Sequence, residues 1–548
     1  MGFFKSLLNK NKAVTLQIKS DFQCPPVTIL YGTKTGNSQL IAQQTHKYFK
    51  QCGIEAECYN MAKYDAGRLP SEKNLLIVIS TDGEGELPPN SQKFYRLLQH
   101  EAMPQLTKLN YAICALGDSN YDIFCGAGKL IDEQLHQLQA KPIINRVDCD
   151  LDFKKPALQW VQNTYDTIVG IKKETSQLNE IELSRPDFLS TPLNKRYKLS
   201  QGETQQGVYH IELDNRELQL KYSAGDCIEI IPSNPTQLVE QLLATLKLKN
   251  NHVLKQYDQT LEQALLHRFE LTKVARPVIK RYLNIFNISK LHQLHADRTA
   301  LKTYLDKADI LDLLRDFPSQ INEDQLVSIL QPLHSRYYSI ASGAKAKPHQ
   351  IDLTIKTIRF EHQQRQYEGA GSVFMNEKLE ENTNVDFRLV ANSSFHLPDD
   401  IKTPVILIGV GTGIAPYRAF LQDLEAQQVK NMAWLIWGDK RQEEDYLYKD
   451  ELMDSLQNNT LAHLDVVFSR DQNEKQYVHH RIQEKKTEIM AWLDKGAHLY
   501  LCGHNAMGNA VKNTLLALFQ SEKGLSEEAA KQQLKELKEQ NIIHEDLY

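Results

Sequence analysis

The sequence lacks any long apolar run. None of its 548 residues lies in a stretch that approaches the roughly 20 apolar residues needed to cross a bilayer. It also lacks a strong charge of either sign, since 64 Lys and Arg residues nearly balance 69 Asp and Glu residues, giving a formal net charge of −5. A nucleic-acid-binding domain usually presents a basic face. The composition therefore favours a protein without a membrane span and without a nucleic acid partner.

Cysteine is scarce and follows no pattern. The eight cysteines form no Cys-x-x-Cys pair and no His/Cys spacing typical of a metal site. We therefore expect no metal, and reduced thiols in a cytoplasmic protein are the plain interpretation. The chain also lacks internal repeats, and its 548 residues exceed what one core usually supports, so several domains are expected.

Apolar strands alternate with helical patterns in the N-terminal third. This alternation is typical of a doubly wound α/β domain with a parallel sheet, here over residues 26–170 behind a short tail at 1–25. A polar, unpatterned stretch at 171–190 is typical of an interdomain linker. The expected strands are Val27–Tyr31, Ala56–Tyr59, Leu75–Ser80 and Tyr111–Leu116, and the expected helices are Ser38–Lys50, Ser91–Gln99 and Lys129–Gln139.

The pattern changes twice in the rest of the chain. Residues 191–235 and 325–400 show the pattern of β-strands, while residues 236–324 repeat apolar positions at helical spacing. Strand–helix alternation returns over residues 401–548. We therefore predict a multidomain α/β chain, in which a helical insert interrupts a β region and a second strand–helix domain follows.

A phosphate loop is expected after the first strand. It consists of Thr33, Lys34, Thr35, Gly36, Asn37 and Ser38. Hydroxyls, an amide and free backbone N–H groups converge there on a helix N-terminus, which suits a phosphate monoester. The loop lacks the Gly-Lys-Ser/Thr ending of a nucleotide P-loop, so nothing indicates a magnesium triphosphate. An ordinary capped turn stays the alternative for this segment alone.

Two further loops follow strands of the same expected sheet. Ligands of such sheets bind at the carboxyl ends of the strands, so the three loops can meet on one ligand. Glycine backbones there can bond the edge of a ring, and a tyrosine can stack on a flat face. One loop contains Ser80, Thr81, Asp82 and Gly83, and the other contains Leu116, Gly117, Asp118, Ser119, Asn120, Tyr121, Asp122, Ile123, Phe124 and Cys125.

These three loops resemble those of flavodoxin-like FMN domains, and above all the FMN domain of the diflavin reductase family. The run at 116–125 is the most specific part of the resemblance, which implies that the three loops bind FMN. One departure is Asp82, because the microsomal branch of the family carries an aromatic residue there. One ring face would therefore rest on Tyr121, with a weaker cover opposite.

The middle of the chain resembles the FAD-binding barrel of ferredoxin-reductase-like proteins. An arginine fork suits a pyrophosphate, a tyrosine suits stacking on a flavin ring, and a glycine-rich helix start can take the same pyrophosphate. Taken singly, an edge strand and a helix cap would explain these motifs. They are Arg336, Tyr337, Tyr338 and Ser339 on a strand and Gly369, Ala370, Gly371 and Ser372 at a helix start, and the resemblance adds Thr354, Ile355 and Lys356 beside the flavin.

The C-terminal third resembles the NADPH domain of the same family. The glycine turn Gly411, Thr412 and Gly413 follows a buried strand, as a pyrophosphate turn does. Ser469 and Arg470 offer a hydroxyl and a permanent cation, which suit a ribose 2′-phosphate, whereas NAD-preferring sites tend to place an acid there. A solvated basic turn is the alternative. The resemblance extends this corner to Lys475, Gln476, Tyr477, Val478 and His479.

Four residues are expected where hydride transfer takes place. Ser339, Cys502, Asp546 and Tyr548 match the residues that border the flavin and the nicotinamide in the family, and the terminal aromatic would stack on FAD and yield to nicotinamide. The segment at 504–510 departs from the family, since it is one residue shorter and Ala510 stands where an acid is usual. Nicotinamide contacts from that segment are therefore left open.

The resemblance implies an NADPH-dependent flavoprotein oxidoreductase. Electrons would pass from NADPH to FAD, then to FMN, and then to a haem-containing partner across a mobile linker. Likeness to the branch of the family that serves sulfite reductase favours the sirohaem subunit as that partner. The tail at 1–25 is shorter than the extension associated with oligomerisation, which leaves room for a stand-alone reductase of another haem protein. A flavin redox sensor without turnover is the third alternative.

Overall fold

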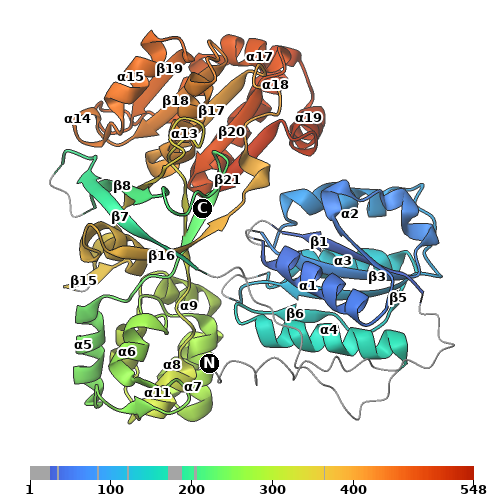
Figure 1. Cartoon of the computed structure of the whole chain (residues 1–548), viewed down its shortest axis with the longest axis vertical. Helices are drawn as coiled ribbons and strands as arrows, with labels where there is room; N and C mark the ends of the chain where they lie inside the picture. The colour runs from blue at the N-terminus through green and yellow to red at the C-terminus, as the bar shows by residue number, and fades with distance from the viewer. Residues whose placement is uncertain are drawn as a thin grey trace, which may run out of the picture. The chain divides into compact units, whose positions relative to one another are not determined.

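The computed structural model describes residues 25–33, 36–82, 85–119, 123–170, 188–202, 206–362 and 364–548. The chain forms two compact units, residues 1–185 and residues 186–548 (Figure 1). Most of the predicted linker lies outside the described residues. Its last two residues, Leu189 and Ser190, are the first of strand β7 (Leu189–Lys198), because they pair with Phe387 and Asp386.

The first unit is built on a parallel sheet with the order β2-β1-β3-β4-β5, and β6 pairs with β4. The four strands predicted from the sequence are confirmed to within one residue at either end. The three central strands are buried along nearly their whole length, as expected of a sheet covered on both faces. The strands are Val27–Gly32 (β1), Ala56–Asn60 (β2), Asn74–Ser80 (β3), Asn110–Leu116 (β4), Lys141–Pro142 (β5) and Val147–Cys149 (β6).

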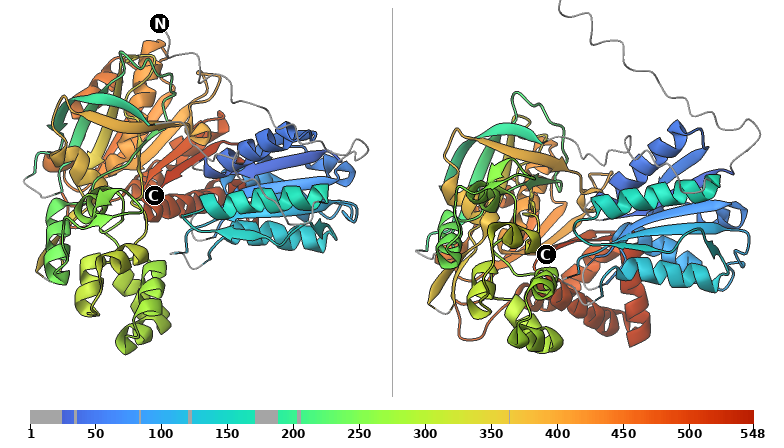
Figure 2. Two further views of the ribbon diagram at one scale, coloured as in Figure 1. Left: turned by 60° about the horizontal axis from the view of Figure 1, so that its bottom comes forward. Right: turned by 90° about the horizontal axis from the view of Figure 1, so that it is seen from below.

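Two helix layers cover this sheet (Figure 2). Helices α1 (Asn37–Gln51) and α4 (Lys154–Val169) pack on one face, around Phe49 and Trp160. Helices α2 (Gln92–Gln99) and α3 (Gly126–Gln137) pack on the other face, around Phe94 and Ile131. The loops that follow the parallel strands therefore gather at one edge of the sheet, which is the edge where ligands of such folds bind.

The second unit begins with an antiparallel barrel of six strands in the order β12-β9-β16-β7-β8-β13. Its two outer strands meet through a bridge between Ile340 and Leu353, where the N–H of Ala341 donates to the carbonyl of Asp352 at 2.7 Å. Closure removes the exposed sheet edges. Besides β7, the strands are Val208–Asp214 (β8), Cys227–Ile230 (β9), Arg336–Ser339 (β12), Gln350–Lys356 (β13) and Asn384–Val390 (β16).

A helical bundle is inserted between β9 and β12 and lies at one end of the barrel (Figure 1). It has its own core, which includes Leu265, Ile279, Tyr282 and Leu313. Helical spacing predicted this insert, which also contains a short strand pair, β10 (Val253–Leu254) and β11 (Gln259–Thr260), that the spacing did not indicate. The helices are Thr236–Leu246 (α5), Leu261–His267 (α6), Arg276–Ile285 (α7), Ser289–Ala296 (α8), Arg298–Leu305 (α9), Ile310–Asp316 (α10) and Glu323–Ile329 (α11).

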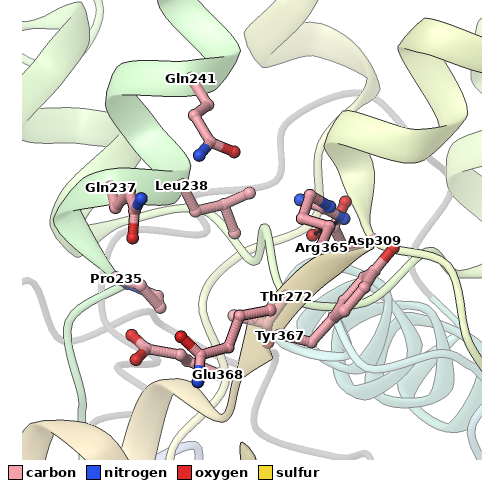
Figure 3. Close-up of a pocket in the computed structure, with 10 residues that line it drawn as sticks. Pro235, Gln237, Leu238, Gln241, Thr272, Asp309, Arg365, Tyr367 and Glu368 are labelled. Atoms are coloured by element: carbon pink, nitrogen blue, oxygen red, sulfur yellow. Dashed lines mark ion pairs between the residues drawn. The ribbon is translucent and has the colours of Figure 1, made fainter. Parts of the chain in front are cut away.

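A hairpin, β14 (Arg359–His362) and β15 (Arg365–Glu368), ties the barrel to this bundle. The guanidinium of Arg365 lies 2.6 Å from Asp309, which precedes α10 (Figure 3). It also lies 2.9 Å from Asp312, in the first turn of α10. Burial and the charge of Asp312 raise the pKa of Asp309 to about 6. The cavity beside these residues holds about 30 Å³, which is room for water rather than for a cofactor.

A parallel sheet with the order β19-β18-β17-β20-β21 completes the second unit. The strands are Val405–Val410 (β17), Ala433–Asp439 (β18), Leu461–Phe468 (β19), His498–Gly503 (β20) and Ile543–Leu547 (β21), and the helices are Ile414–Ala426 (α13), Gln442–Asp445 (α14), Lys449–Gln457 (α15), Val478–Glu484 (α16), Lys486–Asp494 (α17), Asn505–Lys523 (α18) and Glu527–Glu539 (α19). The last strand was not predicted, because its mixed polar sequence carries no strand signal. It pairs with β20, so Asp546 lies opposite Cys502.

A buried charged contact joins the barrel to this parallel sheet. Arg418 of α13, whose side chain is 5% exposed, donates to Asp352 of β13 at 2.7 Å and to Glu451 of α15 at 2.7 Å. His210 of β8 lies 3.7 Å from the same Asp352 carboxylate, and a ring nitrogen of His210 lies 2.8 Å from Tyr448 Oη. Burial lowers the pKa of His210 to about 4. This network fixes the two domains of the second unit to each other.

Candidate cofactor and nucleotide sites

A cavity of about 270 Å³ opens at the carboxyl edge of the first unit's sheet. It brings together the three loops whose meeting the sequence predicted. It also includes residues 150–153, a segment after β6 that sequence reasoning missed because β6 has only three residues. The lining consists of Asn37, Ser80, Thr81, Asp82, Leu116, Gly117, Asp118, Ile123, Asp150, Leu151 and Phe153.

A threonine hydroxyl of the first loop stabilises the loop's own backbone. The N–H of Gly36 donates to Thr33 Oγ1 at 2.9 Å, and the N–H of Thr33 donates to Asn90 Oδ1 at 2.9 Å. Gly36 has a φ of +85°, which glycine adopts without strain. Ser38, in the first turn of α1, is fully buried, and its Oγ has no hydrogen-bond partner among the described residues. That hydroxyl is available to an acceptor such as a bound phosphate.

Thr81 supplies a second hydroxyl of this kind. Thr81 lines the cavity, and its buried Oγ1 also has no partner among the described residues. Since a buried hydroxyl without a partner costs stability, two of them at this sheet edge fit a ligand that accepts hydrogen bonds. The side chains present therefore fit FMN. The remaining residues predicted for this site, Lys34, Thr35, Gly83, Asn120, Tyr121 and Asp122, lie outside the described residues.

Asp150 anchors the loop at 116–125. Ser119 donates to Asp150 twice, from its N–H at 3.1 Å and from its Oγ at 2.6 Å. The N–H of Leu151 donates to the same carboxylate at 2.8 Å. An acid directly after a strand of the same sheet is the signal that could have identified this residue.

Gly117 and Cys125 pack this loop against the sheet. A Cβ on Gly117 would lie 2.8 Å from both the backbone N and the Sγ of Cys125, so a larger residue does not fit. Cys125 is fully buried, and its thiol donates to the carbonyls of Ala115 at 3.6 Å and Cys149 at 3.7 Å. Phe124 packs against the same core. The Cys125 thiol therefore supports the loop from beneath, and any cofactor contact from Cys125 is left to its backbone.

The two flavin motifs of the barrel contact each other. Gly371 lies in helix α12 (Ala370–Val373), and a Cβ there would lie 2.6 Å from Tyr338 Oη and 2.7 Å from Arg336 Cγ. Only glycine permits this approach. Ser372 Oγ accepts from the N–H of Ile358 at 2.9 Å, which fixes the start of α12. Tyr337 is 40% exposed, so its ring is accessible to a flat ligand.

Arg336 is oriented by the helical insert. It donates to Glu270 Oε2 at 2.9 Å and to the carbonyl of His334 at 2.7 Å. Burial opposes ionisation of Glu270, yet the charge of Arg336 keeps the pKa of Glu270 below its ordinary value. A guanidinium has further N–H donors, which remain for a pyrophosphate.

Ser339, Cys502 and Asp546 converge from three strands. Ser339 Oγ donates to Asp546 Oδ2 at 3.1 Å, and Cys502 Sγ lies 4.0 Å from the same oxygen. Cys227 of β9 lies 3.9 Å from Ser339 Oγ and was missed, because nothing in the sequence relates it to the other three. The structure thus brings the predicted residues together where the barrel meets the parallel sheet.

Tyr548 is held in place although its ring is exposed. The residue is 62% exposed, its N–H donates to the carbonyl of Gly503 at 3.0 Å, and its own carbonyl accepts from the N–H of Asn505 at 3.1 Å. Its hydroxyl lies 3.0 Å from Thr412 Oγ1. These contacts place the terminal ring beside the glycine turn.

A second cavity, of about 320 Å³, lies at the carboxyl edge of the parallel sheet. It joins the glycine turn, the terminal tyrosine and the predicted 2′-phosphate corner. Gly411 has a φ of +55°, and the carbonyl of Gly411 accepts from Trp437 Nε1 at 3.0 Å, which fixes the turn. The lining consists of Lys356, Val410, Gly411, Thr412, Gly438, Asp439, Lys440, Val467, Ser469, Gln476, Tyr477, Val478, His504 and Tyr548.

The predicted 2′-phosphate corner rests on β18. The N–H of Ser469 donates to the carbonyl of Asp439 at 2.9 Å, and the N–H of Arg470 donates to the carbonyl of Lys440 at 2.8 Å. The side chains of Arg470 and Lys475 are exposed. The ring of Tyr477 stacks on that of His479, with centroids 5.7 Å apart and planes 11° apart. The corner therefore offers cations and a flat aromatic face to a charged nucleotide.

Thr354, Ile355 and Lys356 do not share one surface. Thr354 Oγ1 lies 2.7 Å from Tyr448 Oη in the buried network, and Ile355 packs in the barrel core. Lys356 lines the dinucleotide cavity instead. Successive side chains of a strand point to opposite faces, which separates Ile355 from Thr354 and Lys356. Thr354 and Lys356 point to the same side of β13, but at different positions along the strand they meet different neighbours. The prediction that this segment lies beside the flavin can therefore hold for its backbone, but the Thr354 and Ile355 side chains are engaged elsewhere.

The segment that departs from the family, 504–510, forms the capped start of α18. His504 Nδ1 accepts from the N–H of Met507 at 3.1 Å, and Ala510 lies inside the helix. His504 also lines the dinucleotide cavity. The shortened segment thus still closes one side of the cavity.

Two kinds of feature are absent from the part of the chain that the structure describes. None of its helices combines the length and apolarity of a membrane span. Its described His, Cys, Asp and Glu side chains form no group of three or more that could hold a metal ion.

Three family models match the chain in order. They are the model described as "Flavodoxin" at residues 29–160, the one described as "FAD binding domain" at residues 183–301, and the one described as "Oxidoreductase NAD-binding domain" at residues 407–513. The first match lies within residues 1–185, the last lies within residues 186–548, and the FAD-binding match begins at residue 183, just before the boundary between the two units.

Curated relatives match almost the whole chain. The sulfite reductase [NADPH] flavoprotein alpha-component of Bacillus subtilis (strain 168) is 34% identical over 552 residues, covering 98% of this chain and 91% of that protein. The same component of Mannheimia succiniciproducens is 33% identical over 557 residues, covering 99% of this chain and 93% of the relative. The same component of Shewanella sp. (strain MR-7) is 34% identical over 542 residues, covering 95% of this chain and 89% of the relative.

Proposed function

This chain belongs to the sulfite reductase [NADPH] flavoprotein alpha-component family, and we propose on that premise that it moves electrons from NADPH, through FAD and FMN, to a haem-containing protein. The partner of this proposal is the haemoprotein subunit that reduces sulfite to sulfide. Because NADPH and reduced thiols belong to reducing compartments, the cytoplasm is the proposed location.

The two flavins have separate places in the chain. The Ser38 and Thr81 hydroxyls and the loop held by Asp150 would hold FMN in the first unit. Arg336, Tyr337 and the start of α12 would hold FAD in the second unit. When bound, the flavins supply the redox chemistry, taking a hydride and giving up single electrons, while the protein supplies position and electrostatics.

The convergence of Ser339, Cys502 and Asp546 is the observation that carries the proposal. Ser339 donates to the Asp546 carboxylate, which fixes the orientation of both side chains. A carboxylate in this position stabilises the positive charge that develops on a nicotinamide as the hydride leaves. Tyr548 closes the same region from the chain end, where its ring can exclude water until a nicotinamide displaces it.

An electron-transfer assay tests the proposal in two stages. The FMN- and FAD-loaded protein should reduce ferricyanide and cytochrome c with NADPH, and failure to do so would favour a flavin redox sensor. With the sirohaem subunit added, it should support reduction of sulfite to sulfide. Reduction of the small acceptors without sulfite reduction would favour the stand-alone reductase of another haem protein, which a pull-down for haem-containing partners would then identify.

A further inference from the structure

One wall of the dinucleotide cavity carries a carboxylate. Asp439 ends β18 and lines the cavity together with Lys440 and with Lys356 of β13. A Cβ placed on Gly411 would lie 3.8 Å from Asp439 Oδ2, so the carboxylate stands beside the glycine turn. The other oxygen, Oδ1, accepts from the N–H of Lys440 at 2.8 Å. Asp439 Oδ2 is therefore an acidic oxygen next to the turn assigned to a pyrophosphate.

The groups around this carboxylate shift the pKa of Asp439 in opposite directions. Burial and the charge of Asp445 in α14 raise the pKa of Asp439 to about 6, while the N–H of Lys440 and the charges of Lys356 and Lys440 act in the opposite direction. The other titratable groups of the cavity wall are Tyr477, His504 and Tyr548. Burial and the charge of Lys440 also lower the pKa of Lys356.

We propose that Asp439 sets the affinity of the dinucleotide cavity and couples it to pH. Ionised Asp439 repels the pyrophosphate of the nucleotide and favours its release, and protonated Asp439 lets the two lysines hold it. This inference rests on the proposed function, because it requires that NADPH occupies this cavity. It gives the cavity a means of releasing an oxidised nucleotide that lysines alone would retain.

The direction of the pH dependence follows from the charges. A bound pyrophosphate is an anion, so it favours the neutral form of Asp439, and binding takes up a proton. Affinity is therefore highest below the pKa of about 6, falls as the pH rises above that value, and levels off where Asp439 is ionised in the complex as well as in the free protein. The repulsion acts on the pyrophosphate, so NADP⁺ and NAD⁺ are affected alike.

Equilibrium binding of NADP⁺ to the flavin-loaded protein between pH 5.5 and pH 8 tests the inference. Asp439→Asn keeps the size of the side chain and removes its charge, so at pH 8 the variant should bind roughly tenfold more tightly than the wild type, while near pH 5.5 the two should agree. The 2′-phosphate titrates near pH 6 as well, as phosphate monoesters do, but identically in both proteins. The difference between the two curves therefore isolates Asp439. Equal dissociation constants at pH 8 would overturn the inference.

Two further variants separate a local effect from a general one. Asp450→Asn removes an exposed carboxylate of α15 outside the cavity and should leave binding unchanged. If it tightens binding as much as Asp439→Asn, net charge is the cause and the local role is refuted. Asp445→Asn removes a charge that raises the pKa of Asp439, so it should move the midpoint of the pH curve downwards. A midpoint that does not move contradicts the inference.

Two measurements keep this inference apart from the proposed function. Calorimetry in two buffers of different ionisation enthalpy should show more proton uptake on NADP⁺ binding by the wild type than by Asp439→Asn near pH 6. Equal uptake refutes the inference even if NADP⁺ binds. If the wild type binds NADP⁺ at no pH, the proposed function fails instead.

Discussion

The described linings of the two nucleotide cavities differ in their cations. The flavin cavity of the first unit is lined by hydroxyls, an amide, a glycine and carboxylates, and its described lining contains no Lys or Arg. The dinucleotide cavity presents Lys356 and Lys440, with exposed Arg470 and Lys475 nearby. Neutral donors at a helix N-terminus hold a phosphate in a fixed geometry, whereas cations attract anions over a distance and release them in salt. Neutral donors therefore suit a cofactor that stays bound, whereas cations suit a nucleotide that binds and dissociates.

The buried residues beneath the two cavities also differ in charge. Beneath the flavin loops lie Cys114 and Cys149, whose sulfur atoms are 3.8 Å apart in the core. Beneath the dinucleotide domain lies the ion pair of Arg418 with Asp352. An apolar support tolerates a substitution of similar volume, but a buried ion pair does not tolerate the loss of one partner.

The largest expected effect tests this difference in support. Arg418→Met leaves the buried Asp352 carboxylate short of its main partner, so we expect the second unit to lose about 3 to 5 kcal/mol of stability. Glu451→Gln removes the exposed end of the same network and should cost less than about 1 kcal/mol. Cys149→Val in the first unit should cost about 1 kcal/mol. Calorimetric unfolding checks all three, and an Arg418 variant as stable as the Glu451 variant would remove the contrast.

The next effect concerns the cations of the dinucleotide cavity. Arg470→Ala should weaken NADPH binding by roughly 10- to 100-fold, the range given by a hydrogen bond to a charged group, and should leave NADH almost unchanged. Arg441→Ala removes another exposed arginine near the same turn and serves as the control. Dissociation constants for both nucleotides at two salt concentrations check this. Equal losses for NADPH and NADH would refute the 2′-phosphate role of Arg470.

A smaller effect concerns the neutral donors of the flavin cavity. Thr81→Val removes a cavity hydroxyl and should weaken FMN by roughly tenfold, since a buried acceptor on the ligand would lose its donor. Thr164→Val is a matched control, because Thr164 Oγ1 is also buried without a partner among the described residues but lies in α4, away from the cavity. Fluorescence of released FMN measures both. If the two variants retain FMN equally, Thr81 is not a ligand.

The sequence predicted those parts of the sites that are local in the chain. The strand, loop and helix around Gly36 carry their own signals, and so does the glycine turn at 411–413. What the sequence could not give depends on strand pairing. Asp150 follows a strand of three residues, and β21 becomes a strand because it pairs with β20. Neither segment has enough apolar residues to signal its structure alone.

The sequence also left open which neighbours each side chain of a motif contacts. Thr354 and Lys356 were placed beside the flavin as one segment, but the first joins the Tyr448 network and the second reaches the dinucleotide cavity. Cys125 likewise belongs to a flavin loop while its thiol faces backbone carbonyls of the core. A motif identifies a segment near a ligand, but tertiary packing determines which side chains of that segment contact the ligand.

The smallest effect concerns the ring that closes the dinucleotide site. Tyr548→Ala removes a ring that a nicotinamide has to displace. The kcat/KM for NADH should rise more than that for NADPH, because NADH lacks the 2′-phosphate that anchors NADPH. The preference for NADPH over NADH in kcat/KM should therefore narrow by roughly 2- to 10-fold, which corresponds to an aromatic stacking interaction of about 1 kcal/mol. Tyr548→Phe keeps the ring and loses only the contact with Thr412, so it should keep the preference of the wild type. A ratio that Tyr548→Ala leaves unchanged would show that the ring does not shield the site, and the exposed terminal residue would then serve only to hold the chain end against β20.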